Sequence, residues 1–232
     1  MKQHIIIDGA CGEGGGQVLR SALTLAILLQ QPVQIRNIRG GRSKPGLLRQ
    51  HLAAVRAAAA ICNGSVSGDE LGSEQITFVP GQVQPGNFHF AIGSAGSTTL
   101  LCQTILLPLA LAGAVSAVQF EGGTHNGMSP SVDFLRQSYL PVLSAMGLET
   151  KITLTQYGFY PAGGGKWSID ITPVTQLKPL SLTLSANADS AADTPLTVMA
   201  LCSQLPESIG QREIAALARA LPTSTAHSTV LT

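Results

Sequence analysis

The sequence predicts an α+β protein built from two copies of one β-α-β-α-β-β unit. Apolar residues make up 44% of the 232 residues and aromatic residues only 4%, which is typical of Ala- and Leu-rich helices packed on sheets and not of a β-sandwich. Landmark residues of the first half recur roughly 80 to 87 residues later, a pattern that indicates a duplicated folding unit. The matching landmarks are Gly16 with Gly96, Gly40 with Gly122, Pro45 with Pro130, Gly64 with Gly147, and Arg49-Gln50 with Arg136-Gln137.

The first unit, residues 1–91, starts with a strand, a glycine-rich loop and an apolar helix. A second strand, a basic loop, a second helix and two strand-like tails follow. The expected elements are strand His4–Ile7, helix Gln17–Leu29, strand Val33–Ile38, helix Leu47–Ile61, and strands Gln75–Val79 and Asn87–Ala91.

The second unit, residues 92–178, repeats this order and completes a core over residues 1–178. Its expected elements are the loop Gly93–Ser97, a helix to Ala112, strand Ala117–Phe120, helix Val132–Met146, and strands Lys151–Gln156 and Lys166–Ile171. The apolar run from Thr98 to Phe120 is long enough to consider a membrane span. Gln103, Pro108 and Gly113 favour a buried helix followed by a strand, so we expect no membrane association.

The pattern changes after Pro173, and we expect residues 179–221 to form part of a further small domain. Leu180–Leu184 and Leu196–Cys202 are expected as strands, Pro206 begins an amphipathic helix, and residues 222–232 are expected as an irregular tail. The four cysteines are scattered without a CxxC pair, which is typical of reduced thiols in a cytoplasmic protein.

The charge distribution gives the first indication of function. The net charge is only +1, yet the stretch from Gly14 to Gly68 contains no Asp or Glu and seven of the 14 basic residues. Arg39, Arg42 and Lys44 lie among glycines, where several side chains can turn toward one anion. Arginine is suited to bidentate phosphate contacts, although a charge run of this kind is often only a solvated loop.

The loop Gly12–Gly16 lies between the first strand and the first helix. Glycines let the backbone approach a phosphate, and free N–H groups at the helix start point at the anion; the alternative is a tight turn without a ligand. The loop matches neither a dinucleotide fingerprint nor a P-loop. Glu13 would repel a phosphate unless a divalent cation lay between them, so we predict Glu13 as a metal ligand, or otherwise as a partner of the helix dipole.

Other candidate residues lie one helical turn beyond these loops. Arg20, on the side of Gln17, is placed to reach an anion at the glycine loop. His51 is a candidate ligand or base, but we expect it to be a satisfied, half-buried histidine. Gln103 on the apolar helix needs a partner or a ligand, while Pro130 and Phe134 form either a wall for a purine or ordinary core. No zinc-site or GxSxG spacing occurs.

Taken together, these stretches resemble the RNA 3'-terminal phosphate cyclase family. The resemblance runs over residues 1–175 and more faintly over Leu196–Leu221. The motifs that carry it are Asp8-Gly9, Gly12–Gln17, Leu19-Arg20, Arg39, Arg42, Lys44–Leu47, Gln50–Leu52, Ile92–Ser97, Gly122–Thr124, Pro130, Asp133-Phe134, Gly158–Pro161 and Gly163–Gly165.

The resemblance implies repeated units like the C-terminal domain of translation initiation factor three, with a small thioredoxin-like domain inserted before a third unit. It also implies ATP-dependent conversion of an RNA 3'-phosphate into a 2',3'-cyclic phosphodiester through adenylylated enzyme and RNA intermediates. A histidine of the third unit carries AMP in that family. This sequence lacks the third unit, and His227 lies outside any matching motif, so we expect a C-terminally shortened member that does not adenylylate itself.

Carried over by position, the resemblance assigns each candidate residue a ligand. Arg20 and Arg42 are the expected catalytic residues, and Glu13 is expected to hold Mg²⁺ or Mn²⁺. The expected partners are RNA 3'-phosphate ends and ATP. A homodimer is left open. Gln17, Gln103, Glu13, Pro130 and Phe134 are assigned to ATP, and Arg39, Arg42 and Gln50 to RNA phosphate. The alternative is a non-catalytic cyclase-like protein in RNA binding or ribosome assembly.

Overall fold

The computed structural model describes residues 3–182, 197–220 and 227–231. It divides into two compact units, an N-terminal unit, Met1–Pro179, and a C-terminal unit, Leu180–Thr232, which we describe separately.

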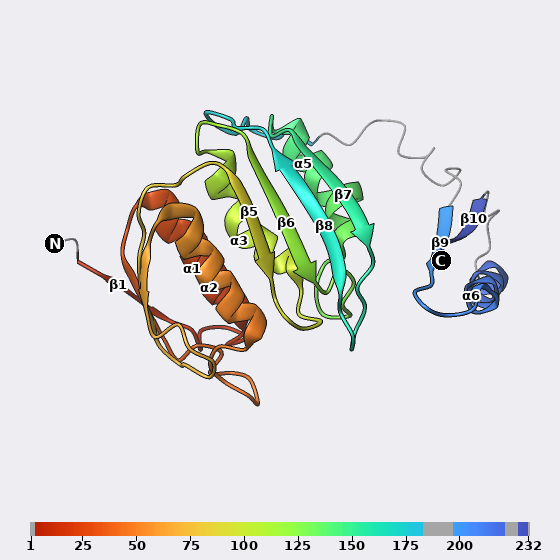
Figure 1. Ribbon diagram of the computed structural model, residues 1–232, viewed down its shortest axis with the longest axis horizontal. Helices are drawn as coiled ribbons and strands as arrows, with labels where there is room; N and C mark the ends of the chain where they lie inside the picture. The colour runs from red at the N-terminus through yellow and green to blue at the C-terminus, as the bar shows by residue number, and fades with distance from the viewer. Residues whose placement is uncertain (1–2, 183–196, 221–226, 232) are drawn as a thin grey trace. The chain divides into compact units, whose positions relative to one another are not determined.

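The N-terminal unit begins with a four-stranded mixed sheet in the order β1-β2-β4-β3. Strands β1 and β2 are parallel, and β4 is antiparallel to both β2 and β3. Two helices, α1 and α2, lie along one side of this sheet (Figure 1). The elements are β1 (Ile5–Asp8), α1 (Gly16–Leu29), β2 (Val33–Arg36), α2 (Arg49–Cys62), β3 (Ser65–Ser67) and β4 (Ile76–Val79).

A second sheet repeats this topology in the order β5-β6-β8-β7, with β5 parallel to β6 and the other pairs antiparallel. Helix α3 lies behind β5, and α5 lies behind β7 and β8 (Figure 1). The elements are β5 (Asn87–Ala91), α3 (Thr98–Ala110), β6 (Ser116–Gly122), α4 (Val132–Phe134), a π-helical turn η1 (Leu135–Tyr139), α5 (Leu140–Ala145), β7 (Thr150–Gln156) and β8 (Gly165–Ile171).

The α+β prediction is confirmed, but the predicted boundary between the repeats is wrong. Asn87–Ala91 forms β5, which pairs with β6 of the second sheet and so opens the second repeat instead of closing the first. The short strand β3 completes the first sheet and was not predicted, because three residues are too few to show alternation. The predicted helix over 132–146 is also not continuous, since the π-helical turn η1 interrupts it.

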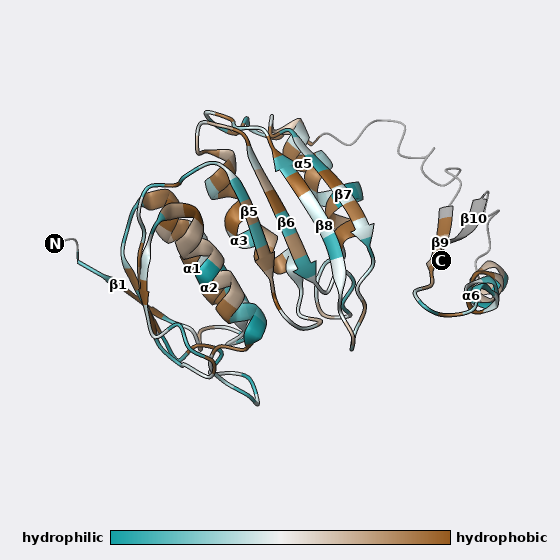
Figure 2. Cartoon of the chain, in the orientation of Figure 1, coloured by the Kyte–Doolittle hydropathy of each residue, from teal (hydrophilic) through white to brown (hydrophobic). Residues whose placement is uncertain are grey.

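The helices pack against one another between the two sheets and form one core. Leu23 and Ile27 of α1 and Ile105 of α3 are fully buried, and Phe78 and Phe120 close the core from the two sheets. The Thr24 hydroxyl of α1 donates to the Thr104 carbonyl of α3 over 2.8 Å. Hydrophilic and hydrophobic residues alternate along the strands of the second sheet (Figure 2), as expected when one face of a sheet lies against helices. These contacts fix the N-terminal ends of α1, α2 and α3 relative to one another.

The C-terminal unit contains β9 (Thr197–Leu201), α6 (Glu207–Ala220) and β10 (His227–Leu231), and β9 and β10 pair in parallel. The prediction of an irregular tail over 222–232 is therefore wrong for His227–Leu231. Residues 180–182 are not in a strand, and the remainder of the strand expected at Leu180–Leu184 lies outside the described residues. No helix in the described parts of the chain is long and apolar enough to span a bilayer.

Candidate functional site

Two adjoining cavities lie where the helices of the N-terminal unit begin. We call the larger, of about 660 Å³, the arginine cavity; its lining is Cys11, Glu13, Gly14, Gly15, Gly16, Gln17, Val18, Arg20, Arg39, Arg42, Leu48, Gln50, His51, Leu100 and Met128. We call the smaller, of about 300 Å³, the apolar cavity; its lining is Gln17, Thr99, Leu100, Cys102, Gln103, Leu106, Pro130, Phe134, Leu135, Tyr139, Leu140 and Ile169. Gln17 and Leu100 line both.

The structure brings all nine predicted site residues to these cavities. Those that line the arginine cavity are Glu13, Gln17, Arg20, Arg39, Arg42 and Gln50. Those that line the apolar cavity are Gln17, Gln103, Pro130 and Phe134. Residues up to 121 positions apart in sequence thus meet at one place, from Glu13 to Phe134.

The starts of α1 and α2 both face the arginine cavity. The residues that precede them, Gly15 and Leu48, make no side-chain capping hydrogen bond, and neither helix carries an acidic residue in its first turn. The first N–H groups of a helix have no partner within the helix, and they carry the positive end of its dipole. Two such ends add their field to that of three arginines, so the cavity favours an anion.

The glycine loop forms a tight turn that packs on the arginine loop. Gly12 and Gly14 have φ of 64° and 55°, in the left-handed region that glycine adopts at little cost. A Cβ on Gly14 would lie 2.5 Å from the Gly41 nitrogen, so the backbones of the two loops are in direct contact. The turn that the sequence offered as an alternative is therefore present, and it holds Glu13 beside Arg42.

Arg20 and His51 are buried beside Gly16. Arg20 is 8% exposed, and its Nη2 donates to Gln17 Oε1 over 2.8 Å. His51 is 4% exposed, and a Cβ on Gly16 would lie 2.4 Å from its Nε2. Within the described residues, neither Arg20 Nε nor His51 Nδ1 has a hydrogen-bond partner. Two unpaired polar atoms in one buried place indicate that a ligand completes the site.

Burial also shifts the pKa values of both groups. It lowers the pKa of Arg20 to about 10, so this side chain stays charged at neutral pH. Burial first, and then the charges of Arg39 and Arg20, lower the pKa of His51 to about 3. The imidazole is therefore neutral at pH 7. The expectation of a satisfied histidine is wrong, because Nδ1 is buried without a partner.

Among the residues that the structure describes, Glu13 is the only carboxylate that lines the arginine cavity. Its Oε2 lies 3.1 Å from Arg42 Nη2, and both side chains are exposed. In the described parts of the chain, no group of three or more His, Cys, Asp or Glu side chains could hold a metal ion. Mg²⁺ is commonly held by one or two carboxylates together with substrate phosphates. The residues present fit a cation shared with a phosphate ligand and do not fit a site made of protein ligands alone.

Arg39 and Gln50 also hold the loops of the cavity together. Arg39 Nη1 donates to the carbonyl oxygens of Lys44 and Gly46, the latter over 3.0 Å. Gln50 Oε1 accepts from the Ser97 N–H over 3.0 Å at the start of α3. Gln50 thus joins the loops of the two repeats, in addition to lining the cavity.

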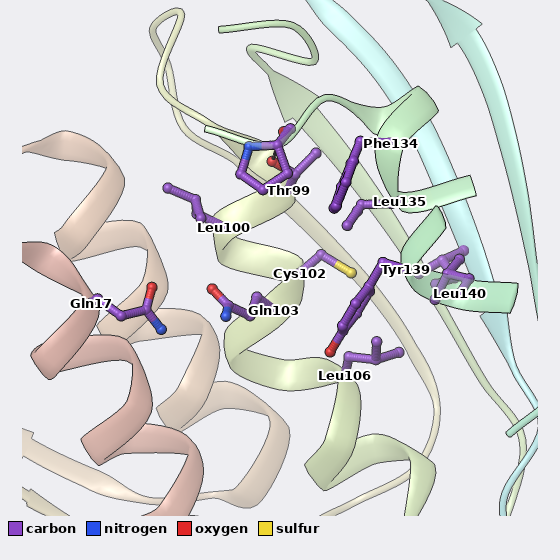
Figure 3. Close-up of a pocket in the computed structure, with 12 residues that line it drawn as sticks. Gln17, Thr99, Leu100, Cys102, Gln103, Leu106, Phe134, Leu135, Tyr139 and Leu140 are labelled. Atoms are coloured by element: carbon purple, nitrogen blue, oxygen red, sulfur yellow. Dashed lines mark hydrogen bonds between the residues drawn. The ribbon is translucent and has the colours of Figure 1, made fainter. Parts of the chain in front are cut away.

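The apolar cavity lies between α1, α3 and the turn η1, and the side chains of Gln17 on α1 and Gln103 on α3 point toward each other (Figure 3). Gln103 is exposed, so the expectation of a buried amide is wrong, while the alternative of a ligand contact agrees with its place in the lining. Pro130 is exposed and Phe134 is 49% exposed, which excludes ordinary core for both and favours a ligand-contacting wall.

Sequence reasoning missed Tyr139, whose half-buried ring lies on the same side of the apolar cavity as Phe134 (Figure 3). In a regular helix, residues three or four apart share a face, but Tyr139 comes five residues after Phe134. The π-helical turn Leu135–Tyr139 brings it into the lining. Such turns often occur at functional sites, but periodicity gives no signal for them.

The fold and the two cavities define a duplicated α+β protein with a basic cavity joined to an apolar one. The chain belongs to the RNA 3'-terminal phosphate cyclase family, because the sequence model of this family matches residues 11–230.

The chain is similar to RNA 3'-terminal phosphate cyclases over most of its length. It is 48% identical over 222 residues to that of Salmonella enteritidis, which covers 96% of this chain and 64% of the relative. It is 49% identical over 210 residues to that of Koribacter versatilis, which covers 90% of this chain and 58% of the relative. The chain thus spans less than two thirds of the length of these curated relatives. The enolpyruvyl transferase NikO from Streptomyces tendae matches 81% of this chain and 33% of its own at 13% identity, with a TM-score of 0.38, too low to define a common fold.

Proposed function

We propose that this chain binds ATP and an RNA 3'-phosphate for the ATP-dependent formation of a 2',3'-cyclic phosphodiester. The observation that carries the proposal is the junction of the two cavities at Gln17 and Leu100. A nucleotide has the same division into an apolar base and an anionic chain of phosphates. Family membership supports the chemistry.

In this proposal the adenine lies in the apolar cavity. Phe134 and Pro130 provide apolar surface, and the amides of Gln17 and Gln103 provide hydrogen-bonding groups in the lining. Apolar pockets with a few polar groups at their edge are typical of small-molecule sites. Gln17 lies at the passage between the cavities, so the phosphates extend from it toward Arg20.

The phosphates of ATP and of the RNA end occupy the arginine cavity. Arg20, Arg39, Arg42 and Gln50 contact them, together with the N–H groups at the starts of α1 and α2. Glu13 holds Mg²⁺ or Mn²⁺, which offsets the charge of the gathered phosphates. To do so, Glu13 gives up its ion pair with Arg42, which frees that guanidinium for phosphate.

The proposed reaction proceeds by transfer of AMP. The RNA 3'-phosphate oxygen attacks the phosphorus of AMP carried on a third-unit histidine, as in the family. A phosphoanhydride forms, and the bond between that phosphorus and the histidine nitrogen breaks. The neighbouring 2'-hydroxyl then attacks the 3'-phosphorus, loses its proton and displaces AMP. The arginines stabilise the negative charge that develops on the phosphate oxygens, which is the largest contribution that fixed groups of this kind can make.

We propose further that the two repeats have the fold of the C-terminal domain of translation initiation factor three. Their common strand order supports this assignment. The β9-α6-β10 arrangement supports the C-terminal unit as part of a thioredoxin-like insert. The free state of all four cysteines supports a cytoplasmic protein.

A binding experiment tests the proposal. The chain is titrated with ATP, and separately with matched RNA oligonucleotides that end in a 3'-phosphate or a 3'-hydroxyl. We expect saturable ATP binding and at least tenfold tighter binding of the phosphorylated RNA, because about 1.4 kcal/mol corresponds to tenfold and a charge-assisted hydrogen bond contributes roughly 1.5–3 kcal/mol. Equal affinity for the two ends would instead support the non-catalytic RNA-binding alternative.

A further inference from the structure

The proposed function leaves the loop from Gly158 to Gly165 without a role. This loop is held against the loop Gly93–Ser97, which is the counterpart in the second repeat of the loop Gly12–Gly16. A Cβ on Gly163 would lie 2.8 Å from the Ala95 Cα, so the two backbones are in contact. The next residue along, Gly96, would bring a Cβ to 3.0 Å from the Gln50 Cβ of the arginine cavity. The Gly158–Gly165 loop therefore contacts the loop Gly93–Ser97, which in turn contacts Gln50 in the lining of the arginine cavity.

The same loop runs beside the segment that carries Met128. The Thr124 N–H donates to the Gly158 carbonyl over 2.8 Å, and the Gly158 N–H donates to the Thr124 hydroxyl over 2.9 Å. His125 and Phe159 form a parallel bridge directly after these bonds. The bridge places Phe159 beside His125, and Tyr160 and Met128 follow it by one and three positions on the two paired segments.

Tyr160 and Met128 are exposed to an unusual degree for large apolar side chains, at 81% and 93%. Met128 lines the arginine cavity. The neighbouring rings of His125, Tyr157 and Phe159 contact one another, with centroids 5.3 to 6.2 Å apart; Tyr157 and Phe159 are stacked, and His125 is tilted against both. Tyr160 makes no ring contact with any other described aromatic residue, so its faces are open to a ligand.

We propose that Tyr160 and Met128 form a stacking surface for the RNA bases immediately 5' of the terminal phosphate. This inference rests on the proposed function, which places that phosphate in the arginine cavity. Single-stranded nucleic acid is bound by basic sites that hold the backbone and by aromatic faces on which bases stack. The arginine cavity supplies the first element, and the exposed Tyr160 ring supplies the second. Stacking on an exposed aromatic ring does not discriminate among the four bases, so this surface should bind RNA ends of any sequence.

The test compares a 3'-phosphorylated RNA of about eight nucleotides with a nucleoside 3'-monophosphate, which is too short to reach beyond the cavity. Stacking contributes about 1–3 kcal/mol per base, so Tyr160→Ala should raise the Kd of the oligonucleotide about tenfold. The Kd of the mononucleotide should change less than twofold. Tyr160→Phe keeps the ring and should bind like the parent protein.

Two controls sharpen the result. Val115→Ala removes an exposed apolar side chain beside Ser116, at the far end of β6 from Gly122, and should change neither Kd. Oligonucleotides with a single abasic nucleotide at successive positions should identify one position at which the effect of Tyr160→Ala disappears.

The outcomes separate the two proposals. If the parent protein binds neither phosphorylated ligand, the proposed function fails, and this inference fails with it. If the parent protein binds both, but Tyr160→Ala weakens both equally or weakens neither, only the stacking surface is overturned. An effect of Tyr160→Ala that persists with every abasic oligonucleotide would also overturn it.

Discussion

Gln17 accepts a hydrogen bond from Arg20 at a distance of 2.8 Å, and Gln17 is also one of the two residues that line both cavities. The Gln17 amide nitrogen, Nε2, donates to the Ser21 hydroxyl over 3.1 Å. One side chain at the passage between an apolar and a basic cavity therefore orients the buried guanidinium. A ligand that extends through both cavities must pass Gln17.

We predict that Arg20→Met weakens anion binding without lowering stability. Arg20 is buried with an unpaired Nε, and replacing a buried charge by an apolar side chain of similar size is often neutral or stabilising. The Kd for inorganic tripolyphosphate should rise about tenfold or more, since a hydrogen bond to a charged group contributes roughly 1.5–3 kcal/mol. Arg56→Gln, which removes an exposed arginine paired with Asp69, is the matched control and should bind as the parent does. A stability loss without any change in binding would show that Arg20 is structural.

Phe134→Ala should weaken ATP binding about tenfold while leaving tripolyphosphate binding unchanged. The ring is half exposed on the wall of the apolar cavity, and stacking of a base on an aromatic ring contributes about 1–3 kcal/mol. Isothermal titration with both ligands measures the difference. Phe134→Tyr keeps the ring and serves as the control; equal losses for the two ligands would place the base elsewhere.

Gly16→Ala should destabilise the N-terminal unit by about 1–3 kcal/mol, the usual cost of an overpacked site. The added Cβ would lie 2.4 Å from His51 Nε2 and 2.9 Å from Arg20 Nη1, so both of these buried side chains must shift to admit it. Gly127→Ala meets nothing within 4 Å and should change stability by less than about 0.5 kcal/mol. Urea unfolding of both variants gives the comparison, and equal midpoints would contradict the packing at Gly16.

The pH dependence of stability should report on His51. Its pKa is about 3 in the folded protein and near the ordinary value of 6.5 when unfolded. Between these values the unfolded state binds more protons, so stability is lost as the pH falls from about 6.5 toward 3. His51→Gln should show a shallower loss over this interval. An imidazole that titrates near 6.5 by NMR in the folded parent would refute the assignment.

Glu13→Gln should remove the dependence of ATP affinity on divalent cations. In the parent protein, chelation of Mg²⁺ should weaken ATP binding, because Glu13 and the phosphates share the ion. In the variant, affinity should be the same with and without Mg²⁺. The Glu13–Arg42 pair is exposed, and such pairs contribute little to stability, so unfolding should not change. A cation effect that survives in the variant would assign the metal to the nucleotide alone.

Much of the fold could be predicted from sequence, because periodicity and glycine landmarks report local structure. Helix α1 starts and ends within one residue of its predicted bounds. Strand pairing is different, since alternation identifies Asn87–Ala91 as a strand but does not say which sheet receives it. That choice depends on partners about 30 residues away in β6, which local patterns do not encode.

The candidate site was predictable in its residues but not in their environments. The charge asymmetry and the glycine loop indicate Arg20, Arg42 and Glu13. The exposure of Gln103 was not predictable, because a polar residue in an apolar helix has the same sequence pattern whether it lies in the core or beside a cavity. The unpaired Nδ1 of His51 depends on how its ring packs against Gly16 of α1, 35 positions earlier in the sequence, and single-sequence patterns carry no such information.

The contact between Gly14 and Gly41 makes ligand binding a measure of correct folding. The two loops touch through their backbones, so the arginine cavity exists only when α1, β2 and α2 are all in place. A ligand of this cavity binds the native state and no partly assembled form. At a concentration of 100 times its Kd it would stabilise the native state by about 2.7 kcal/mol. A rise in thermal midpoint with tripolyphosphate would therefore identify the properly folded fraction of any preparation before its chemistry is assayed.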